Sequence, residues 1–543
     1  MMNRGIRKQK GILLVHPPAA KACEAPGGLA RLAGALRRRG VICRVWDANT
    51  EGQLALMDSA GRACGVANDT WTRRAAGRLT ESRNSLRSWE LYANPDRYRW
   101  AVSSVNRLLA AAAEPFGVRL SLADYEADSL FSVRSADLLR AAATPDENPF
   151  YPWFRGRFPE ILAETAVSHV GFSINYLSQA LTAFAMIGLI KREYPFLKIV
   201  IGGGLVTSWL RNSGRRSLFS GVADEEICGR GEEPLLALLG ESRDGGHDRP
   251  DLEGFPLADY LAPGTILPYS ASEGCWWRRC SFCPEPAEGN SYRPLPPECV
   301  TEDLRALTAQ MKPALIHLLD NALSPALLKT LAEDPPGAAW YGFARVTPLL
   351  ANPQFCMQLK ESGCVMLKLG LESGDQEVLN ALKKGVDLKT SGAVLKNLKA
   401  AGIATYVYLL FGTPAETPAA ARRTMEFTTA HASRIDFLNL AVFNLPVYGP
   451  ETEDLDTGEF YAGDLSLYRP FVHPQGWNRR EVRRFLEKQF KKESCIAAIL
   501  RRTPPFFTSN HAPFFVMASP GDGLRLPGQP SFSDSPASPL AAL

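Results

Sequence analysis

The sequence has no apolar run long enough to cross a membrane. Its N-terminal apolar segment, residues 12–15, is shorter than the core of a signal peptide, and no later run reaches the ~18 residues that a membrane span requires. It also has no polybasic tract, and its formal net charge is only +4 over 543 residues. Bulk electrostatics therefore supports neither a nucleic-acid partner nor a membrane partner, and we expect neither.

Paired cysteine spacings are missing as well. The eleven cysteines are an odd number, and outside the centre of the chain none shows the spacing of a disulfide framework. Together with the absent export signal, this predicts a reducing compartment and hence a cytoplasmic protein. The 45% hydrophobic content is ordinary for a globular chain, and the length allows two or three domains.

The centre of the chain does contain a group of three thiols. Cys275, Cys280 and Cys283 lie within nine residues, with four residues in the first interval and two in the second. The turn is too short for a disulfide framework, whereas three thiolates can fix three irons of a [4Fe–4S] cluster and leave the fourth iron open for a substrate or cosubstrate. A structural zinc site is the alternative, and it would need a fourth ligand such as Cys299 or a histidine.

The first half of the chain has the rhythm of an open parallel sheet. Short apolar runs alternate with helical patterns. The expected strands are residues 11–15, 41–47, 167–173 and 198–201, and the expected helices run from 29, from 178 to 193 and from 235 to 239. Residues 1–240 are therefore predicted to form a Rossmann-like α/β domain, interrupted at about 50–166 by a mostly helical insertion of unassigned function.

Ligands bind open parallel sheets at the carboxyl ends of the strands. In this domain those positions are occupied by Ser173, Gly202, Gly203, Gly204, Gly229, Gly231 and Glu232. We expect these residues to contact a ligand. Tight turns between strand and helix are the alternative role of the glycines.

The second half predicts a parallel barrel. After a linker at 241–264, strand-like runs recur at 268–272, 315–319, 339–343, 365–369, 405–410 and 437–442, with helical patterns between them. Residues 265–450 thus make about six βα units of a partial or full barrel, whose active site would lie at the carboxyl ends of its strands.

The remainder of the chain is predicted to be a C-terminal helical extension at 451–518 and a disordered tail at 519–543. A basic amphipathic helix is expected within 477–500. An aromatic segment at 504–515 is expected to cover one end of the barrel by packing, with substrate contact at Asn510 and His511 as the alternative.

Both halves resemble the radical S-adenosylmethionine (SAM) enzymes that carry an N-terminal cobalamin-binding domain. In the first half the resemblance rests on the order of Leu-Val-His-Pro-Pro at 14–18, Gly-Phe-Ser at 171–173, Gly-Gly-Gly at 202–204 and Gly-Arg-Gly-Glu-Glu at 229–233. In the second half it rests on the cysteine motif and on polar loops after the barrel strands, so that it covers roughly residues 10–450. It implies a [4Fe–4S] cluster, SAM and cobalamin as cofactors.

The chain departs from this family at two points. The usual Cys-x3-Cys-x2-Cys motif gains one residue in its first interval, where the run 276–279 reads Trp-Trp-Arg-Arg. The first loop, His-Pro-Pro at 16–18, lacks the Asp-x-His-x-x-Gly motif with which some cobalamin domains bind cobalt. No cobalt ligand can therefore be named, and His16 is expected to be a packed residue at a strand end.

The resemblance also assigns roles at the mouth of the barrel. Cys275, Cys280 and Cys283 would hold the cluster, whose open iron would chelate the methionine part of SAM. The residues that would contact SAM or substrate are Phe282, Asp320, Asn321, Arg345, Glu372, Ser373, Gly412 and Glu416. Their alternatives are structural and include loop packing, an ion pair at the barrel mouth and the start of a helix.

The function that the resemblance implies is a cobalamin-dependent radical SAM methyltransferase acting on an unactivated centre. Its substrate would be a small molecule or a peptide, and its electron donor a protein such as flavodoxin or ferredoxin. In the family, one SAM supplies the methyl group and a second is cleaved reductively to the radical that abstracts a substrate hydrogen. Two alternatives stay open: a radical SAM enzyme of another outcome, such as ring contraction or oxidation, and a zinc-stabilised binding module without catalysis.

Overall fold

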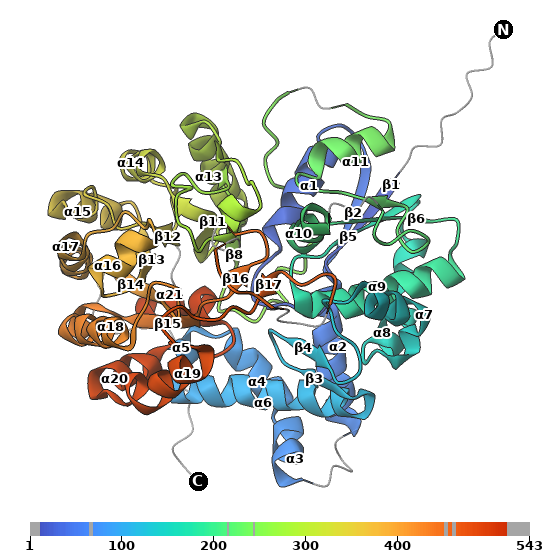
Figure 1. Cartoon of the computed structure of the whole chain (residues 1–543). Helices are drawn as coiled ribbons and strands as arrows, with labels where there is room; N and C mark the ends of the chain where they lie inside the picture. Colours follow the sequence, from blue (N-terminus) through green and yellow to red (C-terminus); the bar gives the residue numbers. More distant parts are fainter. Residues whose placement is uncertain are drawn as a thin grey trace, which may run out of the picture.

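Two parallel sheets, each flanked by helices, lie side by side in the computed structural model (Figure 1). The structure describes residues 11–63, 69–213, 217–242, 245–449, 454–458 and 463–518. The predicted disordered tail at 519–543 lies outside the described residues. In the described part no helix is both long and apolar enough to cross a membrane.

The N-terminal sheet has the strand order β2-β1-β5-β6-β7, and all its strands are parallel. Its strands are β1 Gly11–Val15, β2 Ile42–Trp46, β5 His169–Ser173, β6 Lys198–Gly202 and β7 Glu225–Glu226. The predicted strands are thus confirmed. The order reverses between β1 and β5, which is the switch point where such sheets bind ligands.

Helices cover both faces of this sheet, which explains why β1 is apolar throughout. Leu13 and Val15 share a core with α9 (Leu177–Glu193) and with the insertion. Ile12 and Leu14 instead share a core with α1 (Gly27–Arg37), with α11 (Glu232–Leu239) and with the barrel. Alternate residues of one strand therefore anchor the two halves of the molecule.

The insertion between β2 and β5 is mostly helical, as predicted. It comprises α2 Ala48–Ala63, α3 Thr70–Gly77, α4 Leu79–Leu86, α5 Trp89–Tyr92, α6 Pro95–Ala113, α7 Ser135–Ala143 and α8 Tyr151–Ala163. It also contains an antiparallel hairpin of β3 (Val118–Leu120) and β4 (Tyr125–Ala127). Sequence reasoning missed this hairpin because strands of three residues are too short to establish a period.

The second sheet has six parallel strands in sequence order, β15-β14-β13-β12-β11-β8. They are β8 Ile266–Tyr269, β11 Leu315–Leu323, β12 Trp340–Ala344, β13 Cys364–Glu372, β14 Ala404–Phe411 and β15 Phe437–Val442. The first and last strands are not neighbours in this order, so the sheet is a partial barrel. All six strand predictions are confirmed within a few residues.

Helices follow the barrel strands on the outside (Figure 1). They are α13 Pro297–Met311, α14 Pro325–Glu333, α15 Pro353–Glu361, α16 Gln376–Ala381, α17 Leu388–Ala400 and α18 Pro418–Ala430. Several begin on a side chain that caps the free N–H groups, as Ser324, Asp375 and Thr417 do. These caps fix where each loop at the barrel mouth ends.

The predicted linker packs tightly against both halves in its described part. Tyr260 donates a hydrogen bond to Asp47 at 2.6 Å, and the Leu261 N–H donates to the Ala22 carbonyl at 2.8 Å. Arg249 donates to Asp303 on α13 at 2.8 Å. The connection therefore fixes the two sheets to each other.

The C-terminal extension contains the basic amphipathic helix expected within 477–500, which is α19 Arg479–Lys488. A second helix that was not predicted, α20 Ser494–Arg502, follows after a 3-10 turn at Phe490–Lys492. Phe490 is fully buried and turns the chain inward.

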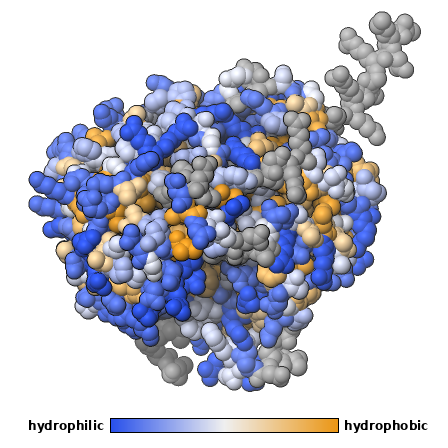
Figure 2. All heavy atoms as spheres, viewed as in Figure 1, coloured by the Kyte–Doolittle hydropathy of each residue, from blue (hydrophilic) through white to orange (hydrophobic). Residues whose placement is uncertain are grey.

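The aromatic segment forms α21 (Thr508–Met517), and the prediction that it covers one end of the barrel is confirmed. Phe514 shares a core with Met366, Ala404 and Phe437, which lie near the starts of their strands. The covered end is therefore the one opposite the predicted active site. On the face in Figure 2 hydrophilic residues dominate and hydrophobic ones form small groups.

Candidate active site

The cysteine motif follows β8 and a short strand, β9 (Ser272–Glu273), at the carboxyl end of the barrel. Asp320 on β11 accepts hydrogen bonds from the Ala271 N–H at 3.0 Å and from the Ser272 hydroxyl. Its buried carboxylate thus holds the segment that leads into the motif. Asp320 therefore supports the segment that precedes the motif. The contact with SAM or substrate predicted for it remains a prediction.

The three thiols lie close enough to influence one another. Burial raises the pKa of Cys283 to about 12, and the neighbouring Cys280 and Cys275 add to the effect. Burial also raises the pKa of Cys280, whereas Lys384 and Arg345 lower it. Two cations beside a group of buried sulfurs suit an anionic iron–sulfur cluster, so the residues present fit that group.

A single-ion site is not formed by these donors. Among the described residues, no group of three or more His, Cys, Asp or Glu side chains is placed to bind one metal ion. Zinc would need such a group, so the zinc alternative gains no support. In a [4Fe–4S] cluster each thiolate binds a different iron, and the ligands do not have to converge on one point.

A buried ion pair lies next to the motif. Lys384 Nζ is 2.7 Å from Glu372 Oε1, and both side chains are buried. Glu372 has a φ of +68°, a conformation that costs a non-glycine residue about 1–2 kcal/mol. Glu372 is the last residue of β13. The contact with SAM predicted for it remains a prediction.

Three of the predicted contact residues take part in hydrogen bonds that fix the loops at the barrel mouth, and their contacts with SAM or substrate remain predictions. Ser373 is fully buried, and its hydroxyl pairs with Thr424 at 3.1 Å. Glu416 is also fully buried and accepts from the Gly412 N–H at 2.5 Å and from the Trp477 indole at 2.8 Å. Burial raises the pKa of Glu416 to about 7. These hydrogen bonds fix the loops after β13 and β14 at the mouth of the barrel.

Phe282 and Asn321 were also predicted at the mouth of the barrel. Phe282 packs against Val378, Leu382 and Ala420. Asn321 is exposed at the end of β11, hydrogen-bonds Glu285 and lines a large cavity. The roles assigned to both stay predictions.

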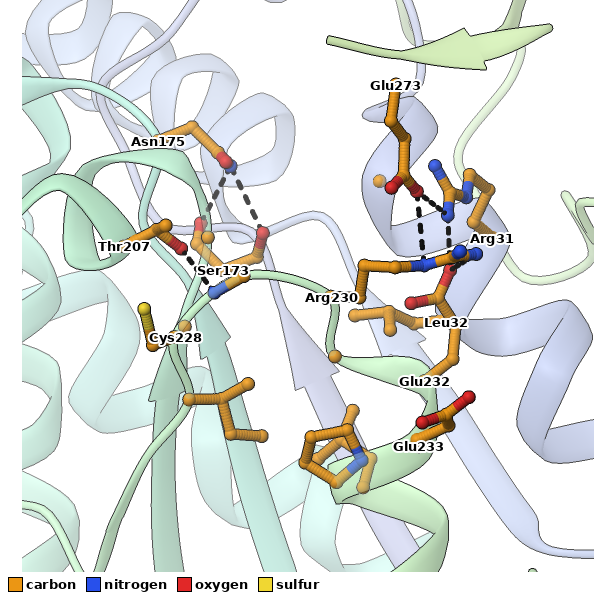
Figure 3. Close-up of a pocket in the computed structure, with 18 of the residues that line it drawn as sticks. Arg31, Leu32, Ser173, Asn175, Thr207, Cys228, Arg230, Glu232, Glu233 and Glu273 are labelled. Atoms are coloured by element: carbon orange, nitrogen blue, oxygen red, sulfur yellow. Dashed lines mark hydrogen bonds and ion pairs between the residues drawn. The ribbon is translucent and has the colours of Figure 1, made fainter. Parts of the chain in front are cut away.

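This cavity, about 730 Å³, opens between the carboxyl edge of the N-terminal sheet and the cysteine motif. Its apolar lining includes Leu14, Leu32 and Val200, and its barrel side includes Glu273, Gly274 and Asn321. Figure 3 shows the open space between two groups of polar side chains. The switch point of the sheet and the residues on either side of the cysteine motif, Gly274 and Glu285, therefore line one chamber.

Polar groups from the strand ends form one side of the cavity (Figure 3). Asn175 donates to the Ser173 hydroxyl at 3.1 Å, and its own oxygen accepts from the Gly204 N–H at 2.9 Å. Thr207 accepts from the Gly229 N–H at 2.9 Å. These bonds fix the glycine turns, so backbone rather than bulky side chains faces the cavity.

An ion cluster forms the other side. Arg31 pairs with Glu232 and lies 2.7 Å from Glu273, while Arg230 Nε is 3.2 Å from Glu273. Arg31 belongs to α1, and Glu273 to the strand before the cysteines. The cluster therefore ties the N-terminal domain to the cysteine motif across the cavity (Figure 3).

An apolar floor with a polar rim fits a large flat ligand with amide edges, such as cobalamin. Of the residues predicted to contact it, Ser173, Gly202, Gly203, Gly229, Gly231 and Glu232 line the cavity. Gly204 lies beside it as the first residue of α10 (Gly204–Ser213). His16 is buried with its Nδ1 atom 3.3 Å from Gln179, as expected for a packed residue.

Sequence reasoning missed several residues of this region. Asn175, Thr207, Arg31 and Glu273 were not singled out, although Asn175 directly follows a strand end, which was an available signal. Nothing local distinguishes Arg31, whose partner Glu273 lies 242 positions away.

Comparison with known proteins identifies the barrel. Residues 269–428 match the Radical SAM superfamily. The matched stretch runs from the end of β8 into α18 and so contains the cysteine motif. A radical SAM domain uses a [4Fe–4S] cluster, which the cysteine motif predicted, and SAM, which the family resemblance implied.

Two curated relatives extend the match beyond the radical SAM domain. The hopanoid C-3 methylase of Methylococcus capsulatus is 26% identical over 66% of this chain and 70% of its own length. The bacteriochlorophyllide d C-12(1)-methyltransferase of Chlorobaculum tepidum is 28% identical over 34% of this chain and 41% of its own length.

A solved structure shares the fold of nearly the whole chain. It is the radical SAM methyltransferase TsrM from Kitasatospora setae, determined with cobalamin and a [4Fe–4S] cluster bound. The TM-score is 0.51 at 16% identity, and the match covers 85% of this chain and 84% of TsrM. The α/β domain followed by a radical SAM domain is therefore an architecture that the two share.

Proposed function

We propose that this radical SAM enzyme is a cobalamin-dependent methyltransferase. The observation that carries the proposal is the cavity of about 730 Å³, because it joins the ligand-binding edge of the N-terminal sheet to the residues that flank the cysteine motif. A cobalamin at that edge would lie directly opposite the SAM site. Both curated relatives named above are methyl-transferring enzymes, which supports the same outcome.

The chain's own residues have defined tasks in this proposal. Cys275, Cys280 and Cys283 would hold the cluster, which supplies the electron that cleaves SAM. Glu372 would orient the SAM amine or ribose. The cavity walls would exclude water from the reacting centre, so that a radical is not quenched by solvent.

Cobalamin would be held without a histidine ligand. Among the described residues that line the cavity none is a histidine. The backbone at Gly202, Gly203 and Gly229 allows close approach of a flat ligand, and Ser173 and Thr207 offer hydroxyl groups to its edge.

The substrate would be a small molecule or a peptide that enters between the two halves. The electron would come from a donor such as flavodoxin or ferredoxin, and the enzyme would work in the cytoplasm, where thiolates stay reduced.

The test is anaerobic reconstitution with iron, sulfide and cobalamin, followed by addition of reductant and methyl-labelled SAM. Bound cobalamin, release of 5′-deoxyadenosine and transfer of label to an acceptor are expected, with Cys280→Ala inactive in SAM cleavage. Radical formation without cobalamin or label transfer would favour rearrangement or oxidation instead. Zinc in place of iron, or SAM cleavage by Cys280→Ala at the wild-type rate, would refute the radical assignment.

A further inference from the structure

The two tryptophans in the lengthened interval of the cysteine motif point to different anchors. Trp276 Nε1 donates to the Leu323 carbonyl at the end of β11 over 3.3 Å, and Trp277 Nε1 donates to the Lys383 carbonyl after α16 over 3.1 Å. Their ring centroids are 6.0 Å apart and their planes are nearly perpendicular, at 81°. Adjacent residues of one loop thus bind two separate segments of the barrel, the end of β11 and the turn after α16.

Arg345, which follows the intervening strand β12, lies against both indoles. Its guanidinium carbon is 4.3 Å from the centroid of Trp277 and 5.6 Å from that of Trp276, which are cation–π distances. Its Nη2 atom donates to the Lys384 carbonyl. The remaining Nη1 atom lies 3.7 Å from the Cys280 sulfur, as a hydrogen-bond donor to it. Only 6% of Arg345 is exposed.

The backbone around this group is shaped to admit Trp277. Gly385 has a φ of +64°, and a Cβ atom there would lie only 2.1 Å from the Trp277 ring. Arg278, directly after Trp277, has a φ of +51°. This left-handed turn brings the chain back to Cys280 after the indole has been placed. The four-residue interval therefore has room for two anchors and a turn, and an interval of three would lose one of them.

We propose that the extra residue of the motif serves to build an indole clamp, formed by Trp276 and Trp277, that holds Arg345 as a hydrogen-bond donor to a cluster-ligand sulfur. The proposal rests on the cluster of the proposed function. A buried cation and an N–H···S bond stabilise the reduced cluster more than the oxidised one, because the reduced cluster carries more negative charge. Arg345 is a positioning residue that raises the reduction potential of the cluster.

This placement also bears on the predicted contact between Arg345 and the SAM carboxylate. Both Nη atoms of Arg345 already have protein partners, and both indoles cover the guanidinium. The structure thus favours a role for Arg345 as a hydrogen-bond donor to the Cys280 sulfur over a contact with the SAM carboxylate.

The test is a redox titration of the reconstituted protein, without SAM or substrate, followed by electron paramagnetic resonance of the reduced cluster. Arg345→Gln is expected to shift the potential to a more negative value, lowering the ratio of reduced to oxidised cluster at a fixed potential about tenfold, or about 59 mV for one electron. Trp277→Leu should shift it in the same direction by less.

Arg279→Gln is the matched control. Arg279 is exposed, and its guanidinium lies 5.1 Å from the same Trp277 ring. Its loss should leave the potential unchanged. An Arg345→Gln protein with a full iron and sulfide content and the wild-type potential would overturn the proposal, as would an equal shift in Arg279→Gln.

If Arg345→Gln fails to retain iron, Trp277→Leu and Arg345→Lys decide. A negative shift in both supports the clamp, and wild-type potentials in both refute it. Wild-type protein that assembles no cluster would refute the proposed function itself, which separates the two failures.

Discussion

Inside the barrel, Lys368 on β13 donates a hydrogen bond to the Nε2 atom of His317 on β11 over 2.9 Å. The Nδ1 atom of the same imidazole lies 2.9 Å from Glu24, in the loop that follows β1. Because Glu24 is acceptor-only when ionised, His317 carries its proton on Nδ1 and accepts from Lys368. Burial opposes the ionisation of Glu24, but His317, Lys368 and Asn510 outweigh it and lower the pKa. A polar chain thus links the barrel interior to the N-terminal domain.

The buried amine predicts a specific pH dependence of stability. Burial lowers the pKa of Lys368 from 10.5 to about 7, with Lys21 adding to the effect and Glu24 opposing it. Between these values the unfolded chain binds more protons, so stability contributed by this group rises as the pH rises from 7. The gain between pH 7 and pH 9 is about 2 kcal/mol.

Lys368→Met should remove that gain. Urea unfolding at pH 7 and pH 9 measures the difference for each protein, and the exposed Lys399 provides the control variant Lys399→Met. Equal pH differences in wild type and Lys368→Met would show that the amine is not perturbed.

Glu416 predicts the opposite slope at lower pH. Burial raises the pKa of its carboxyl from 4.5 to about 7, although the Gly412 N–H and the Trp477 indole oppose the shift. The folded protein therefore binds more protons between these values, and stability is lost as the pH rises through them. From pH 5 to pH 8 the loss is ~2–3 kcal/mol.

Glu416→Gln keeps an acceptor for both donors but cannot ionise, so its stability should change less over the same range. Thermal unfolding at several pH values tests this, with the exposed Glu426→Gln on α18 as the control. A variant that loses as much stability as wild type between pH 5 and pH 8 would contradict the assignment.

Much of the fold was predictable, and the reason lies in local patterns. The strand at 11–15 has the observed bounds because it is an apolar run ended by His16 and two prolines, and the mainly apolar run 437–442 also has the observed bounds. The second helix, α20, was missed because the basic amphipathic pattern continues across Phe490. Lys368 interrupts the apolar run 365–369, a signal that was present and was not used.

The site was predictable only in part, since burial is decided by distant contacts. The family resemblance assigned ligand contacts to Ser373 and Glu416, and these contacts remain predictions. The hydrogen bond that Glu416 accepts from Trp477, 61 positions away, could not be predicted from the sequence. The clamp on Arg345 likewise depends on Gly385, where both the φ of +64° and the close approach of Trp277 require glycine.

Gly203 and Gly204 lie in the turn after β6, which is part of the proposed cobalamin site. The two positions should differ sharply in how well they tolerate alanine. Gly203 has a φ of +107°, and a Cβ atom there would lie 2.5 Å from the Ile174 carbonyl oxygen. For Gly204 the nearest atom is Asn175 Oδ1 at 3.7 Å, and alanine favours the helix that begins there. Gly203→Ala should lower cobalamin affinity at least tenfold, whereas Gly204→Ala should bind within about twofold of wild type.

Equilibrium dialysis with cobalamin gives both affinities, and thermal unfolding checks that each variant is folded. If Gly203→Ala binds cobalamin with wild-type affinity and has wild-type stability, this turn is not part of the cobalamin site.

The ion cluster on one side of the cavity, formed by Arg31, Arg230, Glu232 and Glu273, should help to hold the two halves of the molecule together. Arg31 pairs with Glu232, whose side chain is 7% exposed, and with Glu273 beside the cysteine motif. Arg31→Met leaves Glu232 with Arg230 at 3.6 Å as its nearest cation among the described residues. We expect a loss of ~2–3 kcal/mol, because one buried acid is left poorly paired.

The second substitution Glu232→Gln in the Arg31→Met background should recover part of this loss, since it removes the unpaired charge. Arg119→Met, which removes the exposed pairs of Arg119 with Glu126 and Asp128, should cause no measurable loss. Urea unfolding of the four proteins at one ionic strength measures these effects. If Arg31→Met unfolds with the same free energy as Arg119→Met, the cluster lines the cavity without joining the domains.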